Sequence, residues 1–171
     1  MKHKPMLAYP VSTKPIDYGE PVFVQPKLDG VRCLIQCDNG VITAWSRTGK
    51  PWKNIDHILF NLKPFFQFHP QVVLDGELYN HDLRDNFEKI ISCVRKTKPT
   101  DEHRAESKKL VQFHCYDIEF GMPVMDKFKY LQDNFKAMQG WVGKTATFTY
   151  FERTKANSYR HPLFKCIRDY E

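Results

Sequence analysis

The sequence predicts an α+β fold in which antiparallel β-sheets are flanked by helices. Two hairpin signals, Asp29-Gly30 and Asn39-Gly40, separate runs of β-branched and aromatic residues near the amino terminus. Farther along, segments with helical spacing of apolar residues alternate with strands that are apolar on both faces. A chain of 171 residues suits one domain, so we expect residues 1–171 to form a single domain.

The amino-terminal part of the chain predicts three antiparallel strands after an extended lead-in at residues 1–20. The strands are expected at 21–24, 31–36 and 41–45, because these runs are rich in β-branched and aromatic residues. We expect Gly30 to occupy the first hairpin turn, because glycine accepts a positive φ without steric cost.

The rest of the chain alternates between helical and strand patterns. Asn54 is expected to cap a helix that ends before Pro64, and Asp82 to cap a helix that ends at Arg95. The basic segment 95–109 is expected to be loop-like and either to contact phosphates or to face solvent. The remaining elements are expected as strands at 71–79, 110–118 and 145–153 and as helices at 126–139 and 162–170.

Charge and cysteine content restrict the classes of partner and site. The formal net charge is +6, which favours a polyanionic partner such as nucleic acid, although a merely basic protein has the same balance. Five cysteines occur without a Cys-x-x-Cys pair or a secretory signal, so we expect reduced thiols in a cytoplasmic protein and no zinc site. No apolar run approaches membrane-spanning length, so no membrane partner is expected.

The segment from Lys27 to Arg32, with the sequence KLDGVR, concentrates charge at the first predicted turn. A lysine is a nucleophile only after it loses its proton, which desolvation or nearby cations favour. Near the end of strand 71–79, Asp75 and Glu77 share a face if the strand is regular. These carboxylates are costly to bury unless a metal, a hydroxyl or a cation meets them. A nucleotide phosphorus is the natural electrophile for such a lysine.

These segments resemble the motifs of a known family. KLDGVR at 27–32 resembles motif I, K-x-D-G-x-R, of the covalent nucleotidyltransferases, which comprise ATP-dependent DNA ligases and messenger-RNA capping enzymes. SRTG at 46–49 resembles the Ser-Arg segment of the ligases, LDGE at 74–77 resembles motif III, and 113–118 resembles motif IIIa. The order and spacing also match, and the opening of the chain is most similar to the small ligases of viruses and phages.

The resemblance implies an ATP-grasp-like adenylation domain that works through a lysyl-AMP intermediate. Lys27 would attack the α-phosphorus of ATP and expel pyrophosphate, and Asp29 would assist both the lysine and Mg²⁺. AMP would then pass to the 5′-phosphate at a nick in duplex DNA, and the 3′-hydroxyl would displace AMP to seal the strand. Glu171 would be a metal-binding carboxylate if it begins motif IV.

The resemblance also implies a nucleotide pocket. Arg32 would hold the nucleotide or the 5′-phosphate of the nick, and Arg47 would contact a phosphate of either. Glu77 would bind the ribose hydroxyl, Tyr116 would stack on adenine, and Gln25 would contribute to nucleotide binding.

The family pattern extends beyond the residues present in this sequence. It continues through motif IV and motif V to an OB-fold domain, whereas this sequence stops at Glu171. We therefore expect the front part of an adenylation domain, truncated at motif IV, and weak or absent sealing by this chain alone. A second chain could supply the remaining motifs and the OB-fold.

Two alternative functions remain open from the sequence. A GTP-dependent messenger-RNA capping guanylyltransferase shares motif I, although the SRTG segment favours a ligase. A non-catalytic remnant that binds nucleic acid would keep the basic surface without turnover. For a viral protein, the expected location is the host cytoplasm.

Overall fold

The computed structural model describes two compact units of the chain. The first unit consists of residues 1–5 and 28–134, and the second of residues 6–27 and 135–171. Within these ranges the described residues are 5, 10, 12–17, 19, 25, 27–119, 121–134, 145–149, 152–153, 159–160 and 163–168. No helix in this described part is long and apolar enough to cross a membrane.

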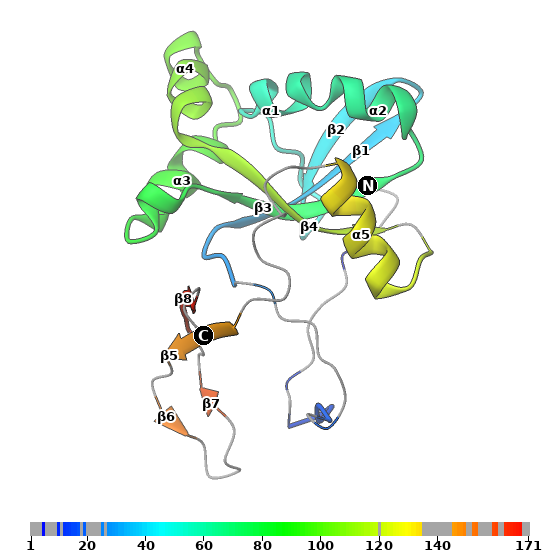
Figure 1. The fold of residues 1–171 in the computed structure, drawn as a ribbon. Helices are drawn as coiled ribbons and strands as arrows, with labels where there is room; N and C mark the ends of the chain where they lie inside the picture. Colours follow the sequence, from blue (N-terminus) through cyan, green and yellow to red (C-terminus); the bar gives the residue numbers. More distant parts are fainter. Residues whose placement is uncertain are drawn as a thin grey trace. The chain divides into compact units, whose positions relative to one another are not determined.

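A four-stranded antiparallel sheet organises the first unit (Figure 1). Its strands are β1 (Val31–Asp38), β2 (Val41–Ser46), β3 (Val73–Tyr79) and β4 (Gln112–Glu119), in the order β2-β1-β3-β4. The neighbouring strands all run antiparallel and helices flank the sheet, so the predicted fold class is confirmed. The turn between β1 and β2 is the predicted Asn39-Gly40 turn, in which both residues have a positive φ.

The core of the first unit lies around the two central strands. Leu34 and Ile35 of β1 and Leu74 of β3 are fully buried, as is Ile118 of β4. Because successive side chains of a strand point to opposite faces, the burial of Leu34 and Ile35 shows that both faces are covered. Each such side chain contributes about 1.5–3 kcal/mol through burial. The polar side chains on β1 and β3 are therefore carried by well-packed strands.

Two short helices follow β2 in place of the single predicted helix. Helix α1 (Asp56–Asn61) ends before Pro64, as predicted, and α2 (Lys63–Phe68) begins immediately afterwards. Pro64 lies in the first turn of α2, where its missing N–H has no helical acceptor to lose.

Asn54 is not the cap of α1, so that expectation is wrong. The cap position is Ile55, which makes no side-chain hydrogen bond. Asn54 is 2% exposed, and its Nδ2 donates to the carbonyl oxygens of Cys93 at 2.9 Å and His103 at 3.1 Å. The hydroxyl of Ser107 donates to the Asn54 carbonyl at 2.5 Å. Asn54 therefore ties its own segment to residues that lie about 40 and 50 positions later in the chain.

The predicted helix at 82–95 is also different in the structure. Asn80 caps a 3₁₀ turn at His81–Leu83 by accepting the Asp82 N–H at 3.0 Å, and α3 begins only at Phe87 and ends at Val94. The apolar stripe of this helix was predicted correctly in part, since Ile90 and Val94 are buried.

The expectation of a loop at 95–109 is wrong for most of that segment. Helix α4 spans Asp101–Leu110. Its start is closed by a reciprocal pair of hydrogen bonds, in which Thr100 Oγ1 accepts the His103 N–H and His103 Nδ1 accepts the Thr100 N–H. Such a capping box satisfies two backbone donors that the first turn would otherwise leave without partners.

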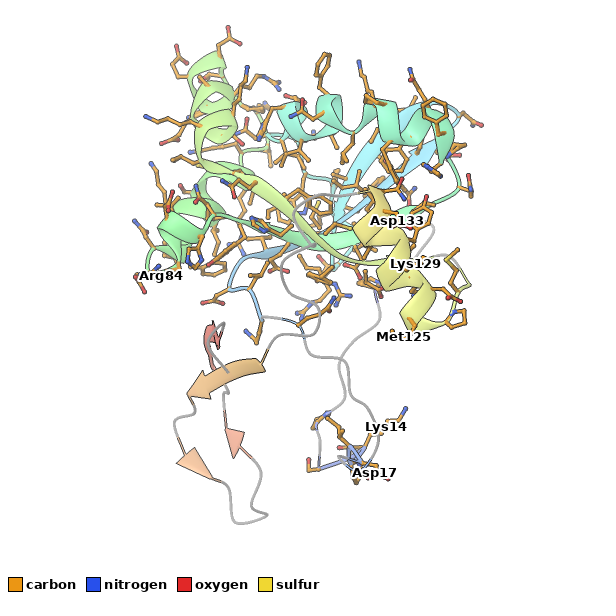
Figure 2. All side chains as sticks on the ribbon, in the orientation of Figure 1. Lys14, Asp17, Arg84, Met125, Lys129 and Asp133 are labelled. Carbon is orange, nitrogen blue, oxygen red and sulfur yellow. The ribbon has the colours of Figure 1, made fainter. Side chains whose placement is uncertain are left out.

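Helix α5 (Val124–Asn134) lies against β4 (Figure 1). Leu131 is 1% exposed, whereas Met125, Lys129 and Asp133 recur every four residues on the solvent side of the helix (Figure 2). The Lys127 ammonium lies 3.4 Å from Asp117 Oδ1 of β4. Positions 135–139 of the predicted helix lie outside the described residues.

The second unit contains two antiparallel strand pairs. β5 (Thr145–Thr149) pairs with β8 (Leu163–Arg168), and β6 (Glu152–Arg153) pairs with β7 (Tyr159–Arg160). The predicted helix at 162–170 is therefore wrong for 163–168, because a short apolar run fits a buried strand as well as a helix. The predicted strand at 21–24 lies outside the described residues.

Candidate active site

Arg32 and Asp75 form a bidentate ion pair on one face of the sheet. The register places Arg32 of β1 opposite Glu77 of β3 and Leu34 opposite Asp75, so the four side chains share a face. Arg32 Nε donates to Asp75 Oδ1 at 3.0 Å, and Nη2 donates to Oδ2 at 2.5 Å. The Asp75 side chain is 2% exposed, whereas that of Arg32 is 22% exposed. A buried carboxylate therefore orients a guanidinium that still reaches the surface.

The hydrogen bond to Asp75 is the main reason why the pKa of Arg32 is raised, and burial acts in the opposite direction. The negative charges of Asp75 and Glu77 act in the same sense as the hydrogen bond. Arg32 is thus a fixed cation on this face, which suits it to hold a phosphate or another anion.

Tyr116 lies at a bulge between β3 and β4. Asp75 pairs with Asp117 while Gly76 pairs with Cys115, so Tyr116 is an extra residue on β4. Such a bulge redirects a side chain relative to a regular strand. Burial raises the pKa of Tyr116, and the charge of Asp75 raises it further. The charges of Arg32 and Glu77 also act on this phenol, which stays protonated at neutral pH.

Gly30 is required for close packing and not for a turn, so the expected reason for this glycine is wrong. The positive φ angles of the described glycines belong to Gly40, Gly49 and Gly121. A Cβ atom on Gly30 would lie 2.5 Å from the Leu78 carbonyl oxygen and 2.7 Å from Glu77 Cγ. The backbone before β1 therefore lies directly against the Glu77 side chain.

Gly76 has a similar role on the other side of β3. A Cβ atom there would collide with the carbonyl oxygen of His114 and would lie 2.6 Å from a ring carbon of Phe113. The group that approaches the backbone at Gly76 is therefore β4.

Arg47 lies in a tightly bonded turn after β2. Ser46 Oγ accepts the Lys50 N–H at 2.9 Å, and the Ser46 N–H donates to the Lys50 carbonyl at 2.8 Å. Trp52 then returns to the sheet, where its indole N–H donates to the Arg32 carbonyl at 3.4 Å. The Arg47 side chain is exposed, as a ligand-binding cation at this position would need to be.

The remaining predicted site residues are divided between the two units of the chain or lie outside the described residues. Asp29 is exposed and belongs to the first unit, one residue before Gly30. Gln25 and Lys27 are exposed and belong to the second unit. Glu171 lies outside the described residues. The structure therefore brings together Arg32, Glu77 and Tyr116, and it adds Asp75 as the residue that orients Arg32.

Asp75 is the site residue whose role sequence reasoning missed. Its charge at the end of an apolar run indicated that it needs a partner. The alternation of side chains along two neighbouring strands could have identified Arg32 as that partner.

Comparisons with known proteins agree with the motif pattern. A family model described as ATP dependent DNA ligase domain matches residues 5–160 of this chain. No curated protein matches the chain in a sequence search.

Several solved structures resemble the chain. The structure called Pmar-Lig_Pre has 22% sequence identity and a TM-score of 0.49, and the match covers 68% of this chain and 27% of that chain. The ligase domain of M. tuberculosis LigD has 21% identity and a TM-score of 0.41, with coverage of 66% of this chain and 36% of that one. The chain thus spans roughly a third or less of the structures it resembles. On the strength of the family model, which matches most of its length, the chain belongs to the ATP-dependent DNA ligase domain family.

Proposed function

We propose that this chain is an adenylation domain of an ATP-dependent DNA ligase and that it acts through a lysyl-AMP intermediate. The observation that carries the proposal is the pairing of Arg32 with Glu77 on one face, close enough to Tyr116 for their charges to act on its phenol, within a segment matched by the family model. A fixed cation, a half-buried carboxylate and an aromatic ring are the three groups that phosphate, ribose and base require.

The proposed first step is attack by Lys27 on the α-phosphorus of ATP. The lone pair of Lys27 Nζ forms the N–P bond, the bond from the α-phosphorus to the bridging oxygen breaks, and pyrophosphate leaves with that electron pair. The proton lost from Nζ passes to solvent. Lys27 is exposed, so a nucleotide can reach it. Arg32 stabilises the negative charge that develops on the phosphate. This stabilisation lowers the barrier because the guanidinium is already oriented before the reaction.

The remaining assignments concern the nucleotide. Glu77 accepts a hydrogen bond from a ribose hydroxyl, and Tyr116 supplies a protonated aromatic ring for stacking on adenine. Arg47 contacts a phosphate from the turn after β2, and Gln25 contributes from the segment before Lys27.

Mg²⁺ is the proposed cofactor, with Asp29 and Glu171 as its carboxylates. Within the described residues no group of three His, Cys, Asp or Glu side chains converges on a common point. A magnesium ion held by one or two carboxylates and by substrate phosphates is compatible with that finding. When bound, the ion would neutralise phosphate charge.

The proposed nucleic-acid substrate is nicked duplex DNA. Transfer of AMP to the 5′-phosphate and displacement of AMP by the 3′-hydroxyl need alignment of the strand ends. We propose that sealing requires further ligase segments, either in the same protein or in a second chain. Adenylation is the step that can be tested on this chain alone.

Incubation of the chain with Mg²⁺ and α-labelled ATP is expected to give a covalent label that survives denaturation and alkali but is released by hot acid, as a P–N bond requires. Incubation with α-labelled GTP is expected to give no label. The variant Lys27→Ala should lose the label, whereas Lys53→Ala, which replaces another exposed lysine, should keep it. Labelling from GTP would indicate a capping-type enzyme. The absence of label from both nucleotides would favour a non-catalytic protein that binds nucleic acid.

A further inference from the structure

A pocket of about 570 Å³ lies between α1 and α4, within the first unit. Its lining includes His57, Phe60 and Asn61 from α1, Arg104 and Lys108 from α4, and Asn54 from the segment before α1. The volume suits a small organic ligand of nucleotide size. None of the residues assigned above to adenylation lines this pocket.

One wall of the pocket holds a buried acceptor without a donor. Asn54 lines the pocket, is 2% exposed, and its Oδ1 has no hydrogen-bond partner among the described residues. The amide cannot simply be turned over, because its Nδ2 donates to two carbonyl oxygens that could not accept from Oδ1. Because this oxygen is itself buried, a ligand in the open pocket does not reach it, and Asn54 contributes to the pocket as part of its wall.

The α4 side of the pocket carries positive charge. Arg104 forms an ion pair with Asp56, which also lines the pocket. Lys108 is exposed, and no ion pair of Lys108 is found in the described part of the chain. A cation at the edge of a pocket attracts an anionic group such as a phosphate.

The α1 side supplies an exposed aromatic ring. Phe60 is 65% exposed, so its ring is open to a ligand at the pocket. The Lys63 ammonium lies 4.9 Å from the centre of the Phe60 ring. An exposed ring with cations nearby is the combination that binds nucleobases by stacking and phosphates by charge.

We propose that this pocket is an accessory nucleotide-binding site, separate from the adenylation site. A nucleobase stacks on Phe60, and the phosphate lies near Lys108. The ligand is either a free nucleotide or a nucleotide unit of a nucleic-acid strand, since the two have this chemistry in common. The proposal does not depend on Lys27.

Titration calorimetry with three probes tests the proposal. The probes are AMP, ribose 5-phosphate and a single-stranded (dA)₆. All variants carry Lys27→Ala, so that differences in binding between them do not involve the lysine proposed for adenylation. Lys108→Glu and Phe60→Ala should each weaken AMP or (dA)₆ binding roughly ten-fold, in line with the energy of one stacked base or one phosphate contact. Lys109→Glu is the matched control, because Lys109 is also exposed on α4 but does not line the pocket. Urea unfolding of each variant confirms that the fold is kept.

The probe that responds identifies the source of the ligand. Loss of AMP binding alone indicates a free nucleotide, and loss of (dA)₆ binding indicates a strand. The proposal is overturned if ribose 5-phosphate binds as tightly as AMP, if Lys109→Glu weakens binding as much as Lys108→Glu, or if neither AMP nor (dA)₆ binds in a way that depends on Lys108 and Phe60.

Discussion

Replacing Arg32 with methionine is expected to destabilise the domain by about 3–5 kcal/mol, because it leaves the carboxylate of Asp75 buried without its cation. The Asp75 side chain is 2% exposed and receives both of its charge-assisted hydrogen bonds from Arg32. A loss of this size is a large share of the 5–15 kcal/mol that typical domains possess. Urea unfolding, followed by circular dichroism, measures the change.

A double-variant cycle separates loss of the ion pair from loss of packing. Asp75→Leu combined with Arg32→Met should recover most of the stability, since an apolar pair of similar volume has no charge to desolvate. If Arg32→Met alone stays within about 1 kcal/mol of the parent chain, the ion pair does not support the fold as inferred. If the double variant is as unstable as Arg32→Met, packing and not charge explains the loss.

Replacing Gly30 with alanine is expected to cost about 3 kcal/mol of stability and most of the ATP-dependent labelling. The added methyl group would lie 2.5 Å from the Leu78 carbonyl oxygen, which belongs to a buried strand and cannot move easily. It would also lie 2.7 Å from Glu77 Cγ, so the carboxylate assigned to the ribose would be displaced. Urea unfolding and the labelling rate measure the two effects.

Gly40 provides the matched control for Gly30. Its φ is +79° and nothing lies within 4 Å of an added Cβ, so Gly40→Ala has only a conformational cost of about 1 kcal/mol. Labelling by Gly40→Ala should therefore stay close to that of the parent chain. Equal labelling losses in the two variants would contradict a specific role for the contact between Gly30 and Glu77.

The sequence predicted the sheet better than it predicted the helices around it. Alternation along 71–79 placed Asp75 and Glu77 on one face, and the structure confirms that they share it. The Asn39-Gly40 turn was also predictable, because few residue pairs accept two positive φ angles. These features depend on short stretches of sequence, so they can be identified without knowledge of tertiary contacts.

Helix α4 was missed because it contributes little to the core. Its buried residue is Ser107, and the remainder of the helix is dominated by charged side chains, so apolar periodicity is absent. The capping box was also hard to recognise, since His103 takes the place of the usual Glu or Gln.

The site residues were predicted by motif, but their physical roles needed tertiary information. The bulge at Tyr116 depends on the register between β3 and β4, and the need for Gly30 depends on how closely β3 approaches. The strand at 163–168 was predicted as a helix because pairing with β5, which is distant in sequence, decides its conformation. Such long-range pairings are not visible in local patterns.

Peptide mapping of the labelled chain by mass spectrometry tests the central proposal most directly. The chain is incubated with ATP and Mg²⁺, digested, and searched for AMP attached to a side chain. The predicted result is AMP attached to Lys27. The adenylated peptide should be absent from Lys27→Ala and present in Lys53→Ala. AMP on a different residue, or no adenylated peptide from a folded chain, would contradict it.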